Sequence, residues 1–148
     1  MIDRFEKFTF AISELHNYLH KITRDEMADY DLKGPHAIYF FVLYRYPEGI
    51  TAAELSEACF RNKADVSRAM TVFEEKGFVV RGNLASGYRA PIALTEKGRH
   101  AAERLRARAE VVVNQVGASL TDEQRAVFYD SMERIAANMR SICKPEKD

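Results

Sequence analysis

The stretch Thr51–Arg99, TAAELSEACFRNKADVSRAMTVFEEKGFVVRGNLASGYRAPIALTEKGR, decides the fold of this chain. It predicts two short helices that are joined by a tight turn. Thr51 and Glu54 form the pattern of a capping box at the start of the first helix. Asn62 is suited to cap a second helix over residues 63–76, because its side-chain oxygen can accept a hydrogen bond from the first turn. Together the two helices predict a helix-turn-helix.

A hairpin is predicted directly after the second helix. Gly77 ends the helix, and residues 78–80 (Phe-Val-Val) are strong strand formers. Residues 82–83 (Gly-Asn) and 86–87 (Ser-Gly) are typical of turns, and residues 90–94 alternate well enough to form a returning strand. A helix-turn-helix followed by a hairpin is a winged helix, so the predicted fold class is mainly α with a small β-hairpin wing.

Long amphipathic helices flank the winged lobe, which we place at residues 35–99. Apolar residues recur at steps of three and four within residues 1–30 and again within residues 100–143. We expect a single domain over residues 1–148, in which the two terminal regions pack together and form a dimer. Packing of these helices within one chain, without a dimer, is the alternative. The expected dimer contacts are Ile2, Phe5, Phe8, Ile12, Val127, Ile135, Met139 and Ile142.

Residues 36–46 are apolar or aromatic at almost every position. A helix that is apolar on all sides is normally buried on all sides, so we expect a central core helix there. The aromatic side chains are also compatible with a ligand cavity, because pockets are usually lined by apolar and aromatic groups. The sequence leaves both interpretations open.

Charge is distributed unevenly along the chain, although the formal net charge is zero. Residues 61–99 contain eight basic and four acidic residues, a net charge of +4, so the remainder carries −4. Local positive charge on a helix-turn-helix is expected of a protein that binds duplex DNA, while an acidic remainder limits non-specific binding. A solvated, salt-bridged surface is the alternative explanation.

Several classes of protein lack support in the sequence. There is no glycine-rich phosphate loop, His-Glu-x-x-His or Gly-x-Ser-x-Gly, so we expect neither catalysis nor a cofactor. There is also no secretory signal and no apolar run of about 18 residues, so we expect a cytoplasmic protein without a membrane partner. Cys59 and Cys143 are too few and too far apart for a disulfide framework or a zinc motif, and both are interpreted as structural.

Residues 63–79, KADVSRAMTVFEEKGFV, and residues 94–98, LTEKG, form a pair of segments at a characteristic separation. With the order of elements around them, they resemble the MarR family of winged-helix transcriptional regulators. The resemblance covers almost the whole chain. It implies an obligate dimer, a recognition helix over about residues 63–76 and a wing over about residues 81–90. The chain departs from the family at residues 86–89 (SGYR), where the family usually has an Asp-x-Arg group.

The predicted recognition helix divides into an apolar and a polar face. Its apolar residues repeat at three-four spacing and are expected to face inward: Val66, Ala69, Met70 and Phe73. Arg68 is the expected base reader, because a guanidinium can pair bidentately with guanine. A phosphate contact, or a salt bridge to Asp65 or Glu75, is the alternative. The other cations are assigned to phosphates or the minor groove. The expected DNA contacts are Arg61, Lys63, Ala64, Ser67, Arg68, Thr71, Arg81, Tyr88 and Arg89.

The resemblance also implies an effector, a small molecule that binds between the dimer helices and the winged lobe. We expect a small aromatic or amphipathic compound, with the lining residues His16, His20, Tyr39, Phe40 and Tyr44. His16 and His20 lie four residues apart, a spacing that can hold a metal, although hydrogen-bonded or solvent-facing histidines are the simpler interpretation. Cys59 is interpreted as a small buried residue, with a redox sensor as the alternative.

The predicted function is that of a sequence-specific transcriptional regulator. Its predicted partners are double-stranded DNA and a second copy of the same chain. As a homodimer it is expected to bind an inverted-repeat operator, to repress transcription there, and to be released by the effector. The alternatives are a winged helix that binds proteins and a regulator that responds to metal or redox state.

Overall fold

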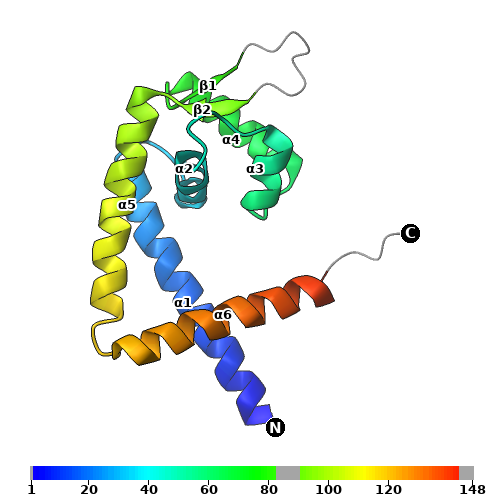
Figure 1. Ribbon diagram of the computed structural model, residues 1–148, viewed down its shortest axis with the longest axis vertical. Coiled ribbons are helices and arrows are strands. Elements are labelled where there is room, and N and C mark those ends of the chain that lie inside the picture. Colours follow the sequence, from blue (N-terminus) through cyan, green and yellow to red (C-terminus); the bar gives the residue numbers. More distant parts are fainter. Residues whose placement is uncertain (1, 83–90, 144–148) are drawn as a thin grey trace. The chain divides into compact units, whose positions relative to one another are not determined.

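The computed structural model describes residues 2–82 and 91–143 (Figure 1). The chain divides into two compact units, Met1–Ala107 and Arg108–Asp148. The elements in chain order are α1 (Ile2–Ala28), the 3-10 helix η1 (Gly34–His36), α2 (Ala37–Tyr44), α3 (Ala52–Ala58), α4 (Lys63–Glu75), β1 (Val79–Arg81), β2 (Ile92–Leu94), α5 (Glu96–Val116) and α6 (Asp122–Ile142). The predicted fold class, mainly α with a small hairpin, is confirmed.

The helices α3 and α4 begin where the sequence predicted. Thr51 Oγ1 accepts a hydrogen bond from the Glu54 N–H at 3.2 Å, and Glu54 Oε2 accepts one from the Thr51 N–H at 2.9 Å. At α4, Asn62 Oδ1 accepts a hydrogen bond from the Asp65 N–H at 2.8 Å. Gly77, at a φ of +77°, ends α4 in a left-handed conformation that favours glycine. Local side-chain chemistry therefore sets the bounds of the helix-turn-helix.

The strands β1 and β2 form an antiparallel pair in the first unit (Figure 1). Their register is Val79↔Leu94, Val80↔Ala93 and Arg81↔Ile92. Ile92 also exchanges two backbone hydrogen bonds with Ile50, of 2.8 and 3.0 Å, which attach the residues before α3 to β2. The predicted contacts Tyr88 and Arg89 lie outside the described residues.

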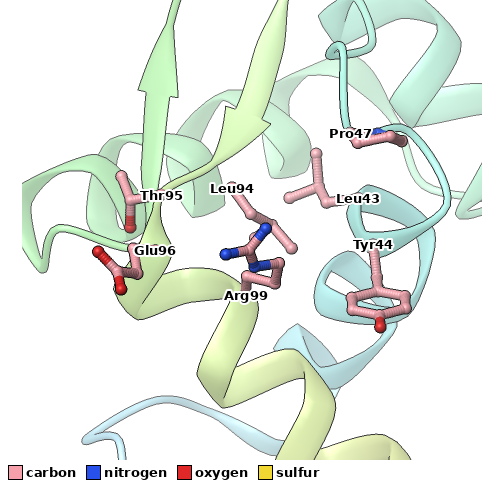
Figure 2. A pocket seen from close by; sticks show the side chains of 7 residues that line it. All are labelled: Leu43, Tyr44, Pro47, Leu94, Thr95, Glu96 and Arg99. Carbon is pink, nitrogen blue, oxygen red and sulfur yellow. The ribbon is translucent and has the colours of Figure 1, made fainter.

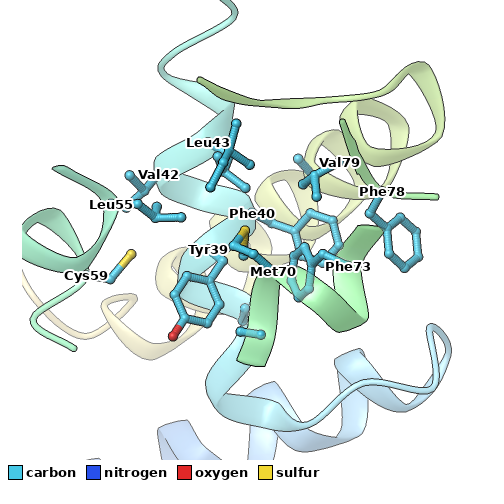
Figure 3. Close-up of a cluster of buried hydrophobic side chains, with 14 of the residues drawn as sticks. Tyr39, Phe40, Val42, Leu43, Leu55, Cys59, Met70, Phe73, Phe78 and Val79 are labelled. Atoms are coloured by element: carbon cyan, nitrogen blue, oxygen red, sulfur yellow. The ribbon is translucent and has the colours of Figure 1, made fainter. Parts of the chain in front are cut away.

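The core of the first unit surrounds α2 (Figure 3). The Phe40 ring packs against the rings of Phe73 of α4 and Phe78, with centroids 4.8 and 5.3 Å apart. Five residues of α2 are buried: Ala37, Tyr39, Phe40, Val42 and Leu43. Ile38, Phe41 and Tyr44 are only partly buried. The core helix is therefore confirmed on one face, and the other face remains accessible.

The end of α4 and the start of α5 are joined by side-chain hydrogen bonds. The Thr95 hydroxyl donates to the Gly77 carbonyl at 2.5 Å and accepts from the Gly98 N–H at 3.1 Å. Lys97 Nζ donates to the Lys76 carbonyl at 2.7 Å. We call this contact the α4–α5 junction. One hydroxyl therefore bonds both segments: Thr95 precedes α5, and it also satisfies the carbonyl of Gly77, which directly follows the C-cap of α4.

The second unit contains the later part of α5 and all of α6. The two helices meet at Gly117, whose carbonyl accepts a hydrogen bond from Arg125 Nη1 at 3.2 Å. A capping box of Thr121 and Gln124, with bonds of 3.2 and 2.9 Å, starts α6. No residue of α6 is buried. The large apolar side chains of α6 are exposed, among them Val127, Ile135 and Met139.

Candidate nucleic-acid interface

Helix α4, the predicted recognition helix, has one buried and one exposed face, as its sequence predicted. The inward residues Val66, Ala69, Met70 and Phe73 are all buried. The five predicted contacts on α4 are all exposed: Lys63, Ala64, Ser67, Arg68 and Thr71. The Thr71 hydroxyl donates a hydrogen bond to the Ser67 carbonyl at 3.0 Å, so it is held along the helix. The outer face of α4 therefore presents mainly polar and cationic groups to solvent.

Arg68 forms an ion pair with Asp65 one turn earlier, through Nη2 and Oδ1. The sequence had left this pairing open as the alternative to base readout. The Arg68 side chain is 71% exposed, and ion pairs this exposed to water contribute little stability. A guanidinium in such a pair can exchange the carboxylate for the acceptor edge of a base at low cost. The ion pair therefore describes the unbound protein and leaves the base-reading role possible.

The remaining cations of the interface differ in their partners. Arg81 Nε pairs with Glu74 Oε2 at 2.8 Å, which connects the end of β1 to α4. Arg61 and Lys63 are exposed and form no ion pair with any residue that the structure describes. Positive charge that is not neutralised therefore concentrates at the N-terminal end of α4, where helix-turn-helix proteins place their base contacts.

A cavity of about 430 Å³ lies beside the N-terminal half of α4. It is lined by Lys33, Pro35, His36, Tyr39, Arg61, Asp65, Arg68, Ala69 and Val72. Burial, together with the nearby charges of Lys33 and Arg61, lowers the pKa of His36 and favours its neutral form. His36 Nδ1 is buried without a hydrogen-bond partner among the described residues. His36 was not among the predicted site residues, because only tertiary packing brings it against α4.

The five predicted effector contacts do not share one cavity. His16 and His20 of α1 line a cavity of about 220 Å³ together with Ile38 and Phe41 of α2. Tyr39 lines the cavity beside α4, and Tyr44 lines a third cavity near the start of α5. Phe40 is fully buried in the core and lines none of these three cavities. The exposed face of α2 thus borders two separate spaces.

The third cavity has a volume of about 590 Å³ (Figure 2). Its apolar wall is formed by Leu43, Pro47 and Leu94, and the Arg99 side chain lies between this wall and Glu96 in Figure 2. The guanidinium of Arg106 lies 4.5 Å from the centroid of the Tyr44 ring, a cation–π contact.

The structural features behind the metal and redox alternatives are weak. The rings of His16 and His20 lie 6.2 Å apart, and within residues 2–82 and 91–143 no cluster of three or more potential metal ligands occurs. Cys59 is buried, and burial raises the pKa of its thiol to about 11, which keeps the reactive thiolate scarce at neutral pH. Cys143 is exposed at the end of α6. Among the described residues, no helix combines the length and apolar character that crossing a membrane requires.

Comparison with known proteins finds similarity to one family. Residues 30–87 match a family model described as the MarR family. A MarR transcriptional regulator from Methanosarcina mazei Go1 is 25% identical, with a TM-score of 0.81 over 93% of this chain and 99% of that one. The transcriptional regulator SlyA is 21% identical, with a TM-score of 0.82 over 90% of this chain and 94% of that one. No curated protein sequence gives a significant match.

A third similar structure is a complex of S. aureus MepR with DNA. It is 16% identical, with a TM-score of 0.79 over 89% of this chain and 96% of that chain, so it supports the fold alone. The matched residues 30–87 contain α2, α3, α4 and β1, the elements that carry most of the predicted interface. The resemblance to the MarR family predicted from the two sequence segments is therefore confirmed over residues 30–87, the part that the family model matches.

Proposed function

We propose that this chain binds an inverted-repeat operator as a homodimer and represses transcription. Its winged helix resembles that of the MarR family of transcriptional regulators. The observation that carries the proposal is the exposed face of α4. There Lys63, Ser67 and Arg68 are open to a partner, while the opposite face is sealed in the core. This arrangement suits a helix that enters the major groove and reads base edges.

Arg68 is the residue assigned to base readout. Replacing it with alanine is expected to cost about 1–3 kcal/mol on the selected operator and to relax sequence preference, because a bidentate contact to guanine is lost. Fold stability should hardly change, since only an exposed ion pair with Asp65 disappears. The measurement is fluorescence anisotropy at fixed salt with two duplexes, one recovered by selection from a random library and one scrambled.

The matched control for this experiment is Arg104→Ala, which removes the same charge from an exposed position on α5. Binding by the Arg68→Ala variant as tight and selective as that of the wild type would refute the base-reading role. Both wild-type affinities should fall steeply as salt rises, because phosphate contacts release counterions. A winged helix that binds proteins instead would show no salt-dependent binding to duplex DNA.

The apolar surfaces of the terminal helices support the dimer. Seven of the predicted dimer contacts are exposed large hydrophobic residues: Phe5, Phe8, Ile12, Val127, Ile135, Met139 and Ile142. The side chain of Ile2 lies outside the described residues. Exposed apolar patches of this kind mark surfaces that bind protein. A second copy of the chain is the partner we propose, because twofold interfaces use the same surface of both subunits.

Replacing Ile135 with glutamate is expected to weaken the dimer by at least about 100-fold, since an unpaired charge would be buried twice across a twofold interface. Sedimentation velocity at micromolar protein should then report monomers where the wild type reports dimers. The control is Ala137→Glu, which places the same charge about 200° away around α6. A wild-type monomer, or equal association of both variants, would contradict the proposed interface.

The proposed effector is a small aromatic or amphipathic compound. The cavity that His16 and His20 line is the space we assign to it, because polar imidazoles and the apolar side chains of Ile38 and Phe41 border it together. Such a compound releases DNA only if it binds one spacing of the two recognition helices more tightly than the other.

A further inference from the structure

Phe60 occupies a backbone conformation that aromatic residues seldom adopt. It follows Cys59, the C-cap of α3, and its φ is +54°, in the left-handed region. The Phe60 N–H donates to the Glu57 carbonyl at 3.3 Å, and the Arg61 N–H donates to the Ser56 carbonyl at 3.1 Å. These two bonds form a Schellman motif, in which glycine is the preferred residue at the position that Phe60 holds.

Two other helix ends in the chain provide an internal comparison. At the end of α4 the same motif has Gly77, with bonds from Gly77 to Glu74 and from Phe78 to Phe73 of 3.0 and 2.8 Å. The end of α1 has Asp31 at a φ of +53°, and aspartate tolerates this region better than bulky residues do. A helix end of this geometry therefore does not require an aromatic residue, and an aromatic residue is unfavourable in this conformation.

The Phe60 side chain does not offset this strain by burial. It is 73% exposed, whereas its neighbour Cys59 is almost completely buried. The turn itself is fixed, because the Ser56 hydroxyl donates to the Arg61 carbonyl at 2.5 Å in addition to the backbone bond between the same residues. The turn thus leaves most of the surface of a large apolar ring exposed. Strained, exposed residues of this kind concentrate at binding sites.

The surroundings of Phe60 indicate a polyanionic partner. The two nearest cations in sequence, Arg61 and Lys63, are exposed and have no ion-pair partner among the residues that the structure describes. Asn62 then caps α4, so Phe60 lies three positions before the first residue of the recognition helix. A helix that enters the major groove from its N-terminal end brings this turn close to the edge of the groove.

We propose that Phe60 is a DNA contact, whose ring packs against apolar groups of the duplex at the groove edge. Those groups are the 5-methyl group of thymine or the carbons of deoxyribose. The inference rests on the proposed DNA-binding function and adds an apolar contact to a set of predicted contacts that is mostly polar. In this arrangement Arg61 and Lys63 supply attraction to phosphates, and Phe60 supplies contact area that salt does not screen.

The test compares stability and DNA affinity in the variant Phe60→Gly. Glycine removes the strain, so the melting temperature should rise by about 2–4 °C at fixed protein concentration. Affinity for a duplex selected by the wild-type protein should fall about tenfold, because an apolar contact is lost. The dependence of affinity on salt should stay unchanged, since no phosphate contact is removed. A purely structural role for Phe60 does not predict opposite changes in stability and affinity.

Two further variants control for flexibility of the turn. Phe60→Asn also lacks the ring but tolerates the left-handed conformation with a stiffer backbone than glycine, so it should lose DNA affinity to a similar extent. Phe60→Tyr keeps the ring and should bind like the wild type. If the glycine and asparagine variants both bind DNA as tightly as the wild type does, the proposal is overturned. Selective binding by the wild type would still leave the proposed function intact in that case. A wild type that binds no duplex would refute both.

Replacing thymine with uracil in the selected duplex distinguishes the two apolar groups. If wild-type affinity falls while that of the glycine variant stays the same, the ring contacts the thymine methyl group. If uracil has no effect on either protein, and the glycine variant still binds more weakly, the ring contacts deoxyribose. Either result supports the contact.

Discussion

Truncation of Phe73 to alanine is expected to lower the free energy of unfolding by about 3–5 kcal/mol, the cost typical of removing a buried aromatic ring. Phe73 of α4 has no exposed surface, and its ring contacts two aromatic residues of α2, Tyr39 and Phe40. Its ring packs against four others, of His36, Tyr39, Phe40 and Phe78, at centroid distances between 4.8 and 6.1 Å. Domains are stable by only about 5–15 kcal/mol, so this loss is a large fraction of the total.

Urea denaturation followed by circular dichroism measures the effect of the Phe73→Ala substitution, at equal protomer concentrations because association adds apparent stability. The control is Phe10→Ala on α1, where the ring is 70% exposed and lies off the apolar stripe predicted to dimerise. That variant should lose less than about 1 kcal/mol. A cost below about 1 kcal/mol for Phe73→Ala would show that α4 is not held through this ring.

Substitution of Gly98 by alanine is the second change with a large expected effect. A Cβ atom there would lie 2.0 Å from the carbonyl oxygen of Phe78, and the obstacle is backbone rather than a movable side chain. We expect a loss of about 3 kcal/mol, because overpacking must separate β1 from α5 and the better helix propensity of alanine offsets only about 1 kcal/mol. The melting temperature should fall by roughly 6–12 °C.

Gly117→Ala is the matched control, since its Cβ would approach the Val113 carbonyl oxygen no closer than 3.3 Å. Scanning calorimetry of both variants should show a large shift for Gly98→Ala and a small one for Gly117→Ala. Equal melting temperatures would mean that the contact between α5 and the residue before β1 relaxes without cost.

The sequence predicted those parts of the fold that depend on local chemistry. Thr51, Asn62 and Gly77 mark the helix ends because their side chains, or the lack of one, act within a single turn of backbone. The inward face of α4 was also predictable, since the spacing of its apolar residues follows the helical repeat. The strands were placed within two residues of their observed bounds, Val79–Arg81 and Ile92–Leu94.

Contacts between distant parts of the chain were harder to predict. The effector site that the resemblance implied grouped Tyr39, Phe40 and Tyr44 as one lining, but successive positions of a helix point in different directions. In the structure Phe40 therefore enters the core while the two tyrosines border different cavities. Phe60 lies in the tight turn that was predicted between the two helices, but its positive φ was not predictable, because sequence does not reveal the sign of φ at the end of a helix.

The α4–α5 junction explains why the segments KGF and LTEKG occur together in this chain. Gly77 and Lys76 offer the carbonyls, Thr95 and Lys97 supply the donors, and Gly98 leaves the space that the Phe78 carbonyl occupies. Each segment thus supplies one side of the α4–α5 junction, and the hydrogen bonds of the junction require both segments. During evolution the two segments should consequently change as a pair, so that relatives with a bulkier residue in one half carry a compensating replacement in the other.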